Sequence, residues 1–494
     1  MRTPIRRFCA GCWASKMACI HSCSNLRQYG EECGVFGIAL KNGTVGSASH
    51  SVYTALYALQ HRGQQSAGIA SVDNGQFHLH KAPGLVPDVF TEKALRPLTG
   101  SAAIGHVRYS SSEDTSAVNA QPIVIRHASG SMALGYNGRL VNAEELRREA
   151  ELRGGIFQTN DSAEVMAYLL VRERMRTNTI EDAVINAMQY LIGAYSVVLL
   201  TQGKLVAFRD PNGFRPLCIG QADGNIMFAS ESCAFPVLGG ELIREVEPGE
   251  VVVADLGTGT FRSYPSGIKA RSSLCMFELI YFARPDSVID GASVDSVRLE
   301  AGRCLARKNT VEADCVIGVP DSGITPAMGF SRESGLPLQT GFVKNRYIGR
   351  TFIQPSEQER EKALRIKLNA LASTVRGKRV IVVDDSIVRG NTCRRTVQLI
   401  REAGAREIHY RVASPPFLYP CFFGTDIPNS EHLIAHERSM EEIRQIIGVD
   451  SLDYLTAEEL GIITKDLNRG VCDACFTGRY NVPVPILNSG EMTR

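Results

Sequence analysis

The stretch V-I-V-V-D-D-S-I-V-R-G-N-T, residues 380–392, decides how the second half of the chain folds. Its first four residues are apolar and β-branched, which is typical of the buried central strand of a parallel sheet. The apolar run ends at Asp384 and Asp385. Two carboxylates are therefore expected at the carboxyl end of a strand, where open α/β sheets bind their ligands.

The loop that follows these two acids has the features of an anion site. Residues 389–392 read Arg-Gly-Asn-Thr and precede a helix-like segment at 394–403. Gly390 lets the backbone approach a ligand closely, and the free N–H groups at a helix N-terminus attract phosphate. A ligand-free, Asp-rich turn that caps a helix is the alternative. The whole string resembles the phosphoribosyl-pyrophosphate loop of type I phosphoribosyltransferases.

This resemblance implies roles for individual side chains. It assigns contacts with phosphoribosyl pyrophosphate to residues at strand ends and in the loops after them: Asp384, Asp385, Ser386, Arg389, Gly390, Asn391, Thr392 and Lys344. It also implies a Mg²⁺ ion held by Ser322, Asp384 and Asp385, where Ser322 follows a second apolar run at 315–320. We expect the basic residues 344–360 to cover this site; a solvated charged loop is the alternative.

The length and composition of the chain restrict its class. With 494 residues the chain has room for more than one domain, each able to bury a core. Hydrophobic residues make up 44% and the formal net charge is +2, which argues against broad nucleic-acid binding and confines any anion site to a local patch. We find no run of 18 apolar residues and expect no membrane span.

Cysteine usage indicates a reducing compartment, for which we expect the cytoplasm. The 14 cysteines are too few and too scattered for a disulfide framework in a chain of this length. Four of them crowd the first 32 residues, a segment with more basic than acidic residues. Three interpretations of residues 1–32 stay open: a targeting peptide, a removed propeptide, or a start codon upstream of the true one at Met17.

Cys33 begins the first globular region, in the sequence E-E-C-G-V-F-G-I at 31–38. Taken alone, it is expected to be a buried core cysteine. The motifs downstream change this interpretation: H-R-G-Q-Q at 61–65, G-H-V-R-Y-S at 105–110 and Y-N-G-R-L at 136–140. Together they resemble the N-terminal-nucleophile glutamine amidotransferases, in which the mature protein starts at the cysteine. The likeness runs from Cys33 to residue 265.

A cysteine at the chain terminus has a chemical advantage. A thiol with an ordinary pKa near 8.5 is mostly protonated at neutral pH and needs a base, and a free α-amine with a pKa of about 7.7–8.0 can serve. Inside the chain, the nitrogen of Cys33 is an amide and cannot accept that proton. We therefore predict cleavage between Glu32 and Cys33.

The resemblance also implies how glutamine is held. Arg108 is expected to pair with the α-carboxylate of glutamine, with a surface ion pair as the alternative. Asn137 and the amide of Gly138 are expected to form the oxyanion hole, although Asn-Gly is also typical of a type I′ turn.

Two positions depart from the pattern of that family. Tyr136 stands where a His usually precedes the Asn-Gly pair. The acid that should bind the amino group of glutamine would fall at Ser162, two residues before a Glu. Asp161 lies one place earlier, and we predict that it takes this role through a small backbone shift.

Hydrophobic patterning divides the chain into two units. Residues 164–192 predict two helices broken near 177–179, and several short strands follow, at 195–200, 204–208 and 225–230, with a last hairpin at 244–255. This pattern favours a layered α+β domain over 33–265. After a boundary within 257–273, an α/β parallel-sheet domain is expected over 266–480, with a helix at 297–308, a strand at 342–347 and a tail at 481–494.

Cys472 and Cys475 form a Cys-x-x-Cys pair, which alone fits a redox motif, half a zinc site or coincidence. The resemblance adds Cys275 and Cys421, and a branch of the family binds a [4Fe–4S] cluster with such a set. We expect this cluster with a structural role, and structural zinc is the alternative.

The complete arrangement resembles the glutamine phosphoribosylpyrophosphate amidotransferase family. This likeness implies that ammonia from glutamine replaces pyrophosphate on phosphoribosyl pyrophosphate and gives 5-phosphoribosylamine, the committed step of purine synthesis. It also implies feedback by purine nucleotides and a homo-oligomer, a dimer or tetramer. Two alternatives stay open: another amidotransferase with the same first domain, such as the hexosamine-forming enzyme, and a regulatory binding protein without turnover.

Overall fold

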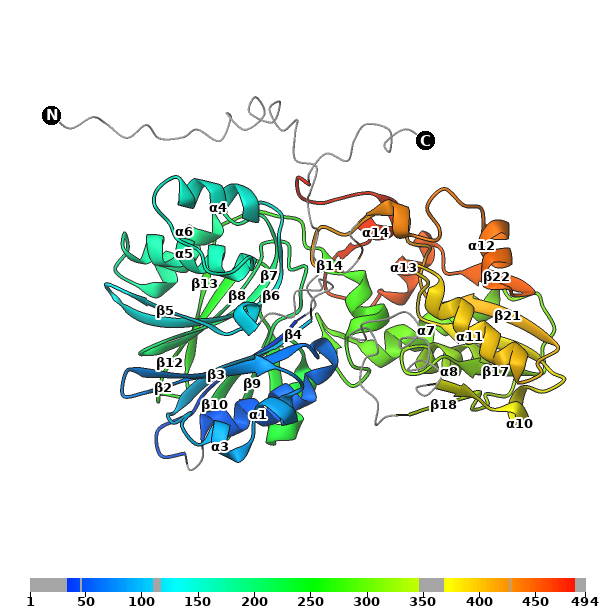
Figure 1. The fold of residues 1–494 in the computed structure, drawn as a ribbon, viewed down its shortest axis with the longest axis horizontal. Helices are drawn as coiled ribbons and strands as arrows, with labels where there is room; N and C mark the ends of the chain where they lie inside the picture. Colours follow the sequence, from blue (N-terminus) through cyan, green and yellow to red (C-terminus); the bar gives the residue numbers. More distant parts are fainter. Residues whose placement is uncertain are drawn as a thin grey trace, which may run out of the picture.

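The structure is a computed structural model that describes residues 33–44, 47–109, 117–345, 368–425, 427 and 429–484. The predictions for residues 1–32, for most of the 344–360 loop and for the tail beyond residue 484 lie outside this part of the chain. The ribbon divides into two halves placed side by side (Figure 1).

The first half contains two antiparallel sheets. The seven-stranded sheet has the order β11-β9-β10-β1-β4-β2-β3. Its strands are β1 (Gly34–Ala39), β2 (Ser66–Asp73), β3 (Gln76–Pro83), β4 (Ala102–Arg108), β9 (Cys218–Ala222), β10 (Asn225–Ala229) and β11 (Glu241–Glu245). The six-stranded sheet has the order β13-β12-β8-β7-β6-β5. Its strands are β5 (Ile123–His127), β6 (Gly130–Leu140), β7 (Gly193–Thr201), β8 (Lys204–Arg209), β12 (Glu250–Asp255) and β13 (Phe261–Pro265).

These sheets pack face to face, and helices cover both outer faces (Figure 1). Val35 and Ile104 of the first sheet share one apolar core with Val198 and Leu205 of the second. The seven-stranded sheet is covered by α1 (Ala48–Ala58), α2 (Val86–Val89) and α3 (Glu92–Leu95). The other sheet is covered by α4 (Ala143–Glu151), α5 (Ser162–Arg174) and α6 (Ile180–Met188). The layered α+β fold and the two helices broken near 177–179 are confirmed.

The predicted hairpin at 244–255 is wrong. β11 pairs with β9 in one sheet, whereas β12 pairs with β8 and β13 in the other. The turn at Pro248 and Gly249 therefore carries the chain between the two layers, and the true hairpin is β12–β13. The run of valines in β12, Val251–Val253, misled the prediction because it shows a strand but not its partner.

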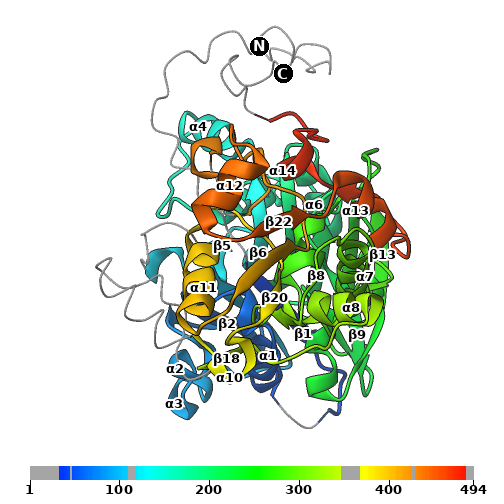
Figure 2. The same ribbon diagram turned by 90° about the vertical axis from the view of Figure 1, so that its right-hand side faces the viewer.

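The second half is built on a four-stranded parallel sheet with the order β17-β20-β21-β22. Its strands are β17 (Cys315–Gly318), β20 (Arg379–Asp384), β21 (Glu407–Val412) and β22 (Ser451–Tyr454). Ile381 and Val383 pack toward α7 (Val294–Arg307) and α8 (Ile324–Ser334). Val380 and Val382 pack toward α11 (Asn391–Glu402) and α12 (Met440–Ile447). Figure 2 shows the helices on either side of these strands, which explains why the run has no polar alternation.

Short elements complete the second half. The strand predicted at 342–347 is a short β18 (Phe342–Lys344), which pairs with β19 (Leu368–Ala370) in a separate two-stranded sheet. Two further helices are α10 (Ala372–Val375) and α13 (Ala457–Ile463). Within the described residues, no helix combines the length and apolar character that a membrane crossing requires.

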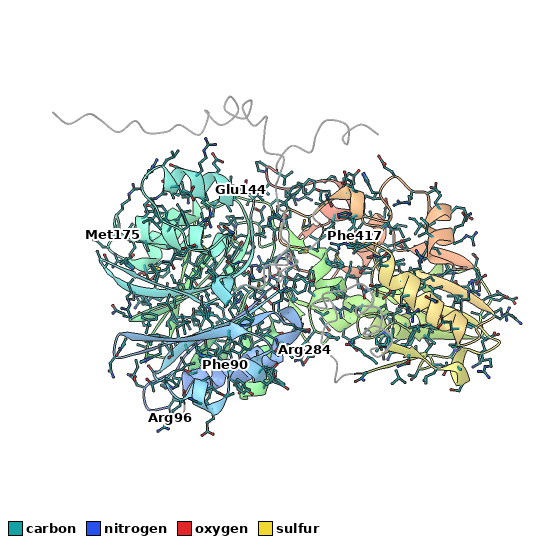
Figure 3. All side chains as sticks on the ribbon, in the orientation of Figure 1. Phe90, Arg96, Glu144, Met175, Arg284 and Phe417 are labelled. Atoms are coloured by element: carbon teal, nitrogen blue, oxygen red, sulfur yellow. The ribbon has the colours of Figure 1, made fainter. Side chains whose placement is uncertain are left out.

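The junction joins distant parts of the chain. A π-helix, η6 (Glu278–Phe282), follows β14 (Leu274–Cys275), and β14 pairs in parallel with β23 (Val471–Cys472), just before α14 (Ala474–Thr477). The hairpin of β15 (Val288–Ile289) and β16 (Ala292–Ser293) comes next. Arg284, between these elements, lies at the border of the two halves (Figure 3).

Candidate active sites

Cys33 lies at the head of β1, and its side chain is buried. Its backbone N–H donates to Oδ1 of Asn137 at 3.2 Å, and its Sγ lies 3.8 Å from the carbonyl oxygen of Tyr109. The nitrogen of Cys33 and the side chain of Asn137 thus meet at one point although they come from different sheets.

Asn137 and Gly138 lie inside strand β6, opposite Ser196 and Tyr195 of β7, so the type I′ turn is excluded. Gly138 has a φ of +137°, and a Cβ at this position would lie 2.2 Å from the carbonyl oxygen of Ala194. Only glycine fits this backbone, because the added carbon would collide with main-chain atoms that cannot move aside.

Arg108 and Asp161 face each other near these residues. Nε of Arg108, at the end of β4, lies 4.0 Å from Oδ2 of Asp161, and both side chains are almost fully buried. Asp161 is the N-cap of α5, where Oδ1 accepts a hydrogen bond from the N–H of Ala163 at 2.8 Å. Ser162 is the first residue of that helix. A guanidinium beside a carboxylate is complementary to the zwitterionic end of an amino acid.

Two buried side chains, to which the sequence analysis gave no role, hold Tyr136, the residue before Asn137. Oε1 of Gln121 accepts a hydrogen bond from the N–H of Tyr136 at 2.9 Å, and Nε2 of His106 donates to its carbonyl oxygen at 3.0 Å. Burial lowers the pKa of His106 to about 3, so the imidazole is neutral and carries its proton on Nε2. Nε2 of Gln121 donates to Oδ2 of Asp161 at 3.1 Å.

A buried charge network connects Cys33 with the second half. Nε of Arg62 donates to the carbonyl oxygen of Cys33 at 2.9 Å, and its other nitrogens contact Glu231 at 2.6 Å and Glu278 at 2.8 Å. Arg215 contacts Glu278 at 2.9 Å and the carbonyl oxygen of Phe423 at 3.1 Å. Burial opposes ionisation of Glu278, but the two guanidinium groups hold its pKa below the usual range. The ion pairs are therefore charged within the interior.

In the second half, the structure brings together the two predicted acids and Ser322. Asp384 ends β20, and both acids are more than 90% buried. Asp385 accepts hydrogen bonds from the hydroxyls of Ser322 and Ser386. Tyr410, which sequence motifs did not reveal, donates from its hydroxyl to Oδ2 of Asp384 at 2.5 Å. Burial and the neighbouring Asp385 raise the pKa of Asp384 well above its ordinary value, so the pair favours a cation or hydroxyl donors.

The loop after the acids leads into a helix, as predicted. Gly390 has a φ of +80° and is the N-cap of α11, which starts at Asn391, earlier than the predicted residue 394. Arg389 and Thr392 flank this turn. Lys344, at the end of β18, forms an ion pair with Asp321, the residue before Ser322. The basic and hydroxyl side chains are thus placed around the carboxyl edge of β17 and β20.

Four cysteines from three segments line one cavity: Cys275, Cys421, Cys472 and Cys475. The cavity measures about 10 Å³, room for about one water molecule, and is also lined by Phe214, Phe423 and Tyr480. Burial raises the pKa of Cys275 to about 11 and that of Cys472 well above its usual value. In the described part of the chain, no set of three or more His, Cys, Asp or Glu side chains has the spacing that would enclose a metal ion.

Comparisons with known proteins cover both halves. Residues 106–236 match the model of a glutamine amidotransferase domain, and residues 300–413 match that of a phosphoribosyl transferase domain. The amidophosphoribosyltransferase of Methanocaldococcus jannaschii is 44% identical, over 92% of this chain and 98% of the relative. That of Bacillus subtilis is 46% identical, over 92% and 95%.

A solved structure agrees with these relatives. Glutamine phosphoribosylpyrophosphate amidotransferase from B. subtilis, in complex with ADP and GMP, superimposes with a TM-score of 0.84 at 45% identity, over 92% of this chain and 98% of the other. Relatives of this similarity share both halves, so neither the hexosamine-forming enzyme nor a binding protein without turnover is favoured. The chain belongs to the amidophosphoribosyltransferase family, the enzymes that transfer ammonia from glutamine to phosphoribosyl pyrophosphate in the first committed step of purine biosynthesis.

Proposed function

We propose that Cys33 becomes the nucleophile of this enzyme after cleavage between Glu32 and Cys33. The observation that carries the proposal is the contact of 3.2 Å between the nitrogen of Cys33 and Oδ1 of Asn137. Once that nitrogen is a free amine, it can take the thiol proton while Sγ attacks the amide carbon of glutamine. Ammonia leaves, and water later hydrolyses the γ-glutamyl thioester to glutamate.

The remaining residues of this site follow from charge and geometry. Arg108 pairs with the α-carboxylate of glutamine and Asp161 with its ammonium group, in place of their mutual contact at 4.0 Å. The side chain of Asn137 and the N–H of Gly138 stabilise the oxyanion, a role worth about 2.7–4 kcal/mol per donor in other acyl-transfer enzymes. Ammonia then passes inside the protein to the second site.

In the second half, Asp384 and Asp385 bind the ribose hydroxyls, with Ser386 and Lys344 beside them. Arg389, Gly390, Asn391 and Thr392 bind the 5′-phosphate at the start of α11, where backbone N–H groups favour an anion. The donor set of Ser322, Asp384 and Asp385 consists of oxygen ligands, which suits Mg²⁺. When bound, Mg²⁺ neutralises the departing pyrophosphate.

The four thiols that line the cavity are of the ligand type that a [4Fe–4S] cluster requires, although no three of them stand at metal-enclosing spacing among the described residues. When bound, such a cluster would tie the junction to the C-terminal segment. Zinc is the competing occupant, since four cysteines also suit a tetrahedral zinc site. A brown preparation with a visible absorption that bleaches in air supports the cluster, whereas a colourless protein with stoichiometric zinc excludes it. Cys472→Ser should lower the melting temperature before it changes the chemistry.

Further properties belong to the same proposal. The units span 33–265 and 266–480, with residues 1–32 as a propeptide or N-terminal extension. Purine nucleotides act as feedback inhibitors, in line with the ADP and GMP bound to the B. subtilis enzyme. The protein forms a dimer or tetramer, and it functions in the cytoplasm, in line with the free thiols of the described cysteines.

Glutaminase activity, measured with and without phosphoribosyl pyrophosphate, tests the two-site proposal. We expect the second substrate to stimulate ammonia release, because ammonia that is released without bound phosphoribosyl pyrophosphate has no acceptor in the second site. Mass spectrometry of the active enzyme should find a chain that starts at Cys33. An active enzyme that retains residues 1–32 would exclude the terminal amine as the base.

A further inference from the structure

Strand β6 loses its neighbour on one side just before the oxyanion residues. The last pair between β5 and β6 is Ile123 with Leu134, whereas β7 continues to pair with β6 as far as Leu140. At Tyr136 two side chains replace the absent strand: Gln121 binds the backbone N–H at 2.9 Å and His106 the carbonyl oxygen at 3.0 Å. The position of Asn137, the next residue, therefore depends on the β7 ladder on one side and on these two side chains on the other.

Gln121 also contacts the proposed substrate site. Its amide nitrogen donates to Oδ2 of Asp161 at 3.1 Å, and this is the oxygen that lies 4.0 Å from Nε of Arg108. Gln121 has no exposed surface and Asp161 only 3%. The buried amide of Gln121 thus connects Asp161, the proposed partner of the substrate ammonium group, with strand β6, which carries the proposed oxyanion hole.

We propose that Gln121 is a positioning residue that couples recognition of the α-amino group of glutamine to the geometry of the oxyanion hole. This inference rests on the proposed roles of Asp161, Asn137 and Gly138. The α-ammonium group of bound glutamine holds the carboxylate of Asp161 in place. That carboxylate orients the amide of Gln121, which in turn positions the backbone N–H of Tyr136. The amino group of the substrate then contributes to turnover as well as to binding, because preorganised donors act mainly on the transition state.

The coupling has a kinetic consequence that separates kcat from KM. Asp161→Asn keeps the helix cap but loses the charge that binds ammonium. In the otherwise wild-type enzyme we expect this variant to raise KM for glutamine and to lower kcat about tenfold, the effect of one hydrogen bond. In a Gln121→Met background, where the connection is already broken, the same change should raise KM and leave kcat nearly unaltered.

A second measurement uses an altered substrate. Glutaramate is glutamine without its α-amino group. Gln121→Met should lower kcat for glutamine about ten times more than kcat for glutaramate, since only glutamine engages Asp161. His106→Asn is the matched control: His106 holds Tyr136 but contacts the carbonyl oxygen rather than Asp161, so both substrates should lose the same factor.

Three results would overturn the proposal. They are an unchanged kcat in Gln121→Met, equal losses for both substrates, or an Asp161→Asn effect on kcat that is the same in both backgrounds. If the methionine variant does not fold, Gln121→Asn replaces it, because its amide is one methylene too short to reach both partners. A wild-type enzyme that releases no ammonia from glutamine would instead refute the proposed function itself.

Discussion

At the scale of single residues, the proposed mechanism gives the thiol of Cys33 one task, to release nitrogen from glutamine, while the sugar phosphate reacts at the second site. Cys33→Ala should therefore abolish glutamine-dependent formation of 5-phosphoribosylamine and leave the ammonia-dependent reaction intact. Assays with glutamine and with ammonium chloride, both following pyrophosphate release, measure this difference. Loss of both activities in a folded variant would contradict the division of labour between the two sites.

Tyr410 gives a prediction for the second site. Its hydroxyl donates to Asp384 at 2.5 Å inside the protein, so Tyr410→Phe removes one donor from a buried carboxylate. We expect KM for phosphoribosyl pyrophosphate to rise about 3- to 10-fold. This rise is smaller than the loss of a hydrogen bond to a charged group would give, because the bound substrate donates to Asp384 in place of Tyr410.

A tyrosine at the far end of the same sheet serves as the control. Tyr454→Phe, on β22, should leave that KM unchanged, since no bond from Tyr454 to either acid is present in the described residues. A fourfold rise in the control as well would show that the effect comes from packing rather than from Asp384.

Sequence motifs located those candidate site residues that are close to one another in the sequence, such as Asp384 and Asp385. They did not locate Gln121 or Tyr410, whose partners are Asp161 and Asp384. An isolated Gln or Tyr carries no local pattern, and its contact exists only once the strands are paired. Asp161, in contrast, could be named from sequence because it stands one place from the expected position.

At the scale of elements, β6 depends on glycine at one point. Gly138→Ala would place a methyl group 2.2 Å from the carbonyl oxygen of Ala194, in a backbone conformation with a φ of +137°. We expect glutaminase activity to fall at least 100-fold and the free energy of unfolding to drop by about 1–3 kcal/mol, because the proposed oxyanion donors must move.

Gly154→Ala is the matched control for this strand. Gly154 also has a positive φ, +86°, but no atom lies within 4 Å of the added carbon. Its activity should stay near that of the wild type, with only a modest loss of stability in urea unfolding. Similar loss of activity in both variants would mean that strain, not collision with β7, disables the site.

Helices and buried strands could be predicted as elements because their periodicity lies in contiguous residues. α5 and α6 fall where the pattern placed them, and β20 has the apolar run that two covered faces require. Strand partners could not be predicted in the same way. β11 and β12 are consecutive in the chain but belong to different sheets, and the residue pattern of a strand does not encode which sheet receives it.

At the scale of the whole molecule, a cluster of charges joins the halves. Arg209 of β8 and Asp290 of the β15–β16 turn are both fully buried and 2.9 Å apart. Glu245 of β11 is partly buried and accepts from the N–H of Asp290 at 3.3 Å. Burial, with repulsion from Asp290, raises the pKa of Glu245 to about 8.

This cluster predicts how stability depends on pH. A glutamate with a raised folded pKa binds its proton more tightly in the folded state, so its contribution to stability is lost as pH rises from about 4.5 to about 8. Glu245→Gln cannot ionise, and it should become more stabilising relative to the wild type between pH 5.5 and pH 8.5. Urea unfolding at both pH values measures the difference.

Glu241→Gln, at the exposed start of the same strand, is the control. It should change the free energy of unfolding by the same amount at both pH values. If Glu245→Gln also changes it equally at both pH values, the carboxyl of Glu245 does not change its charge in this range.

The parallel pairing of β14 with β23 affects the order of events during synthesis. In this register Cys275 lies opposite Cys472, which comes from the far end of the chain. The ribosome must therefore release nearly the whole polypeptide before the second half can close, while the two-sheet half has long been complete. A nascent chain stalled ahead of residue 471 should expose the apolar junction around η6, and chaperones should retain it there until the last segment arrives.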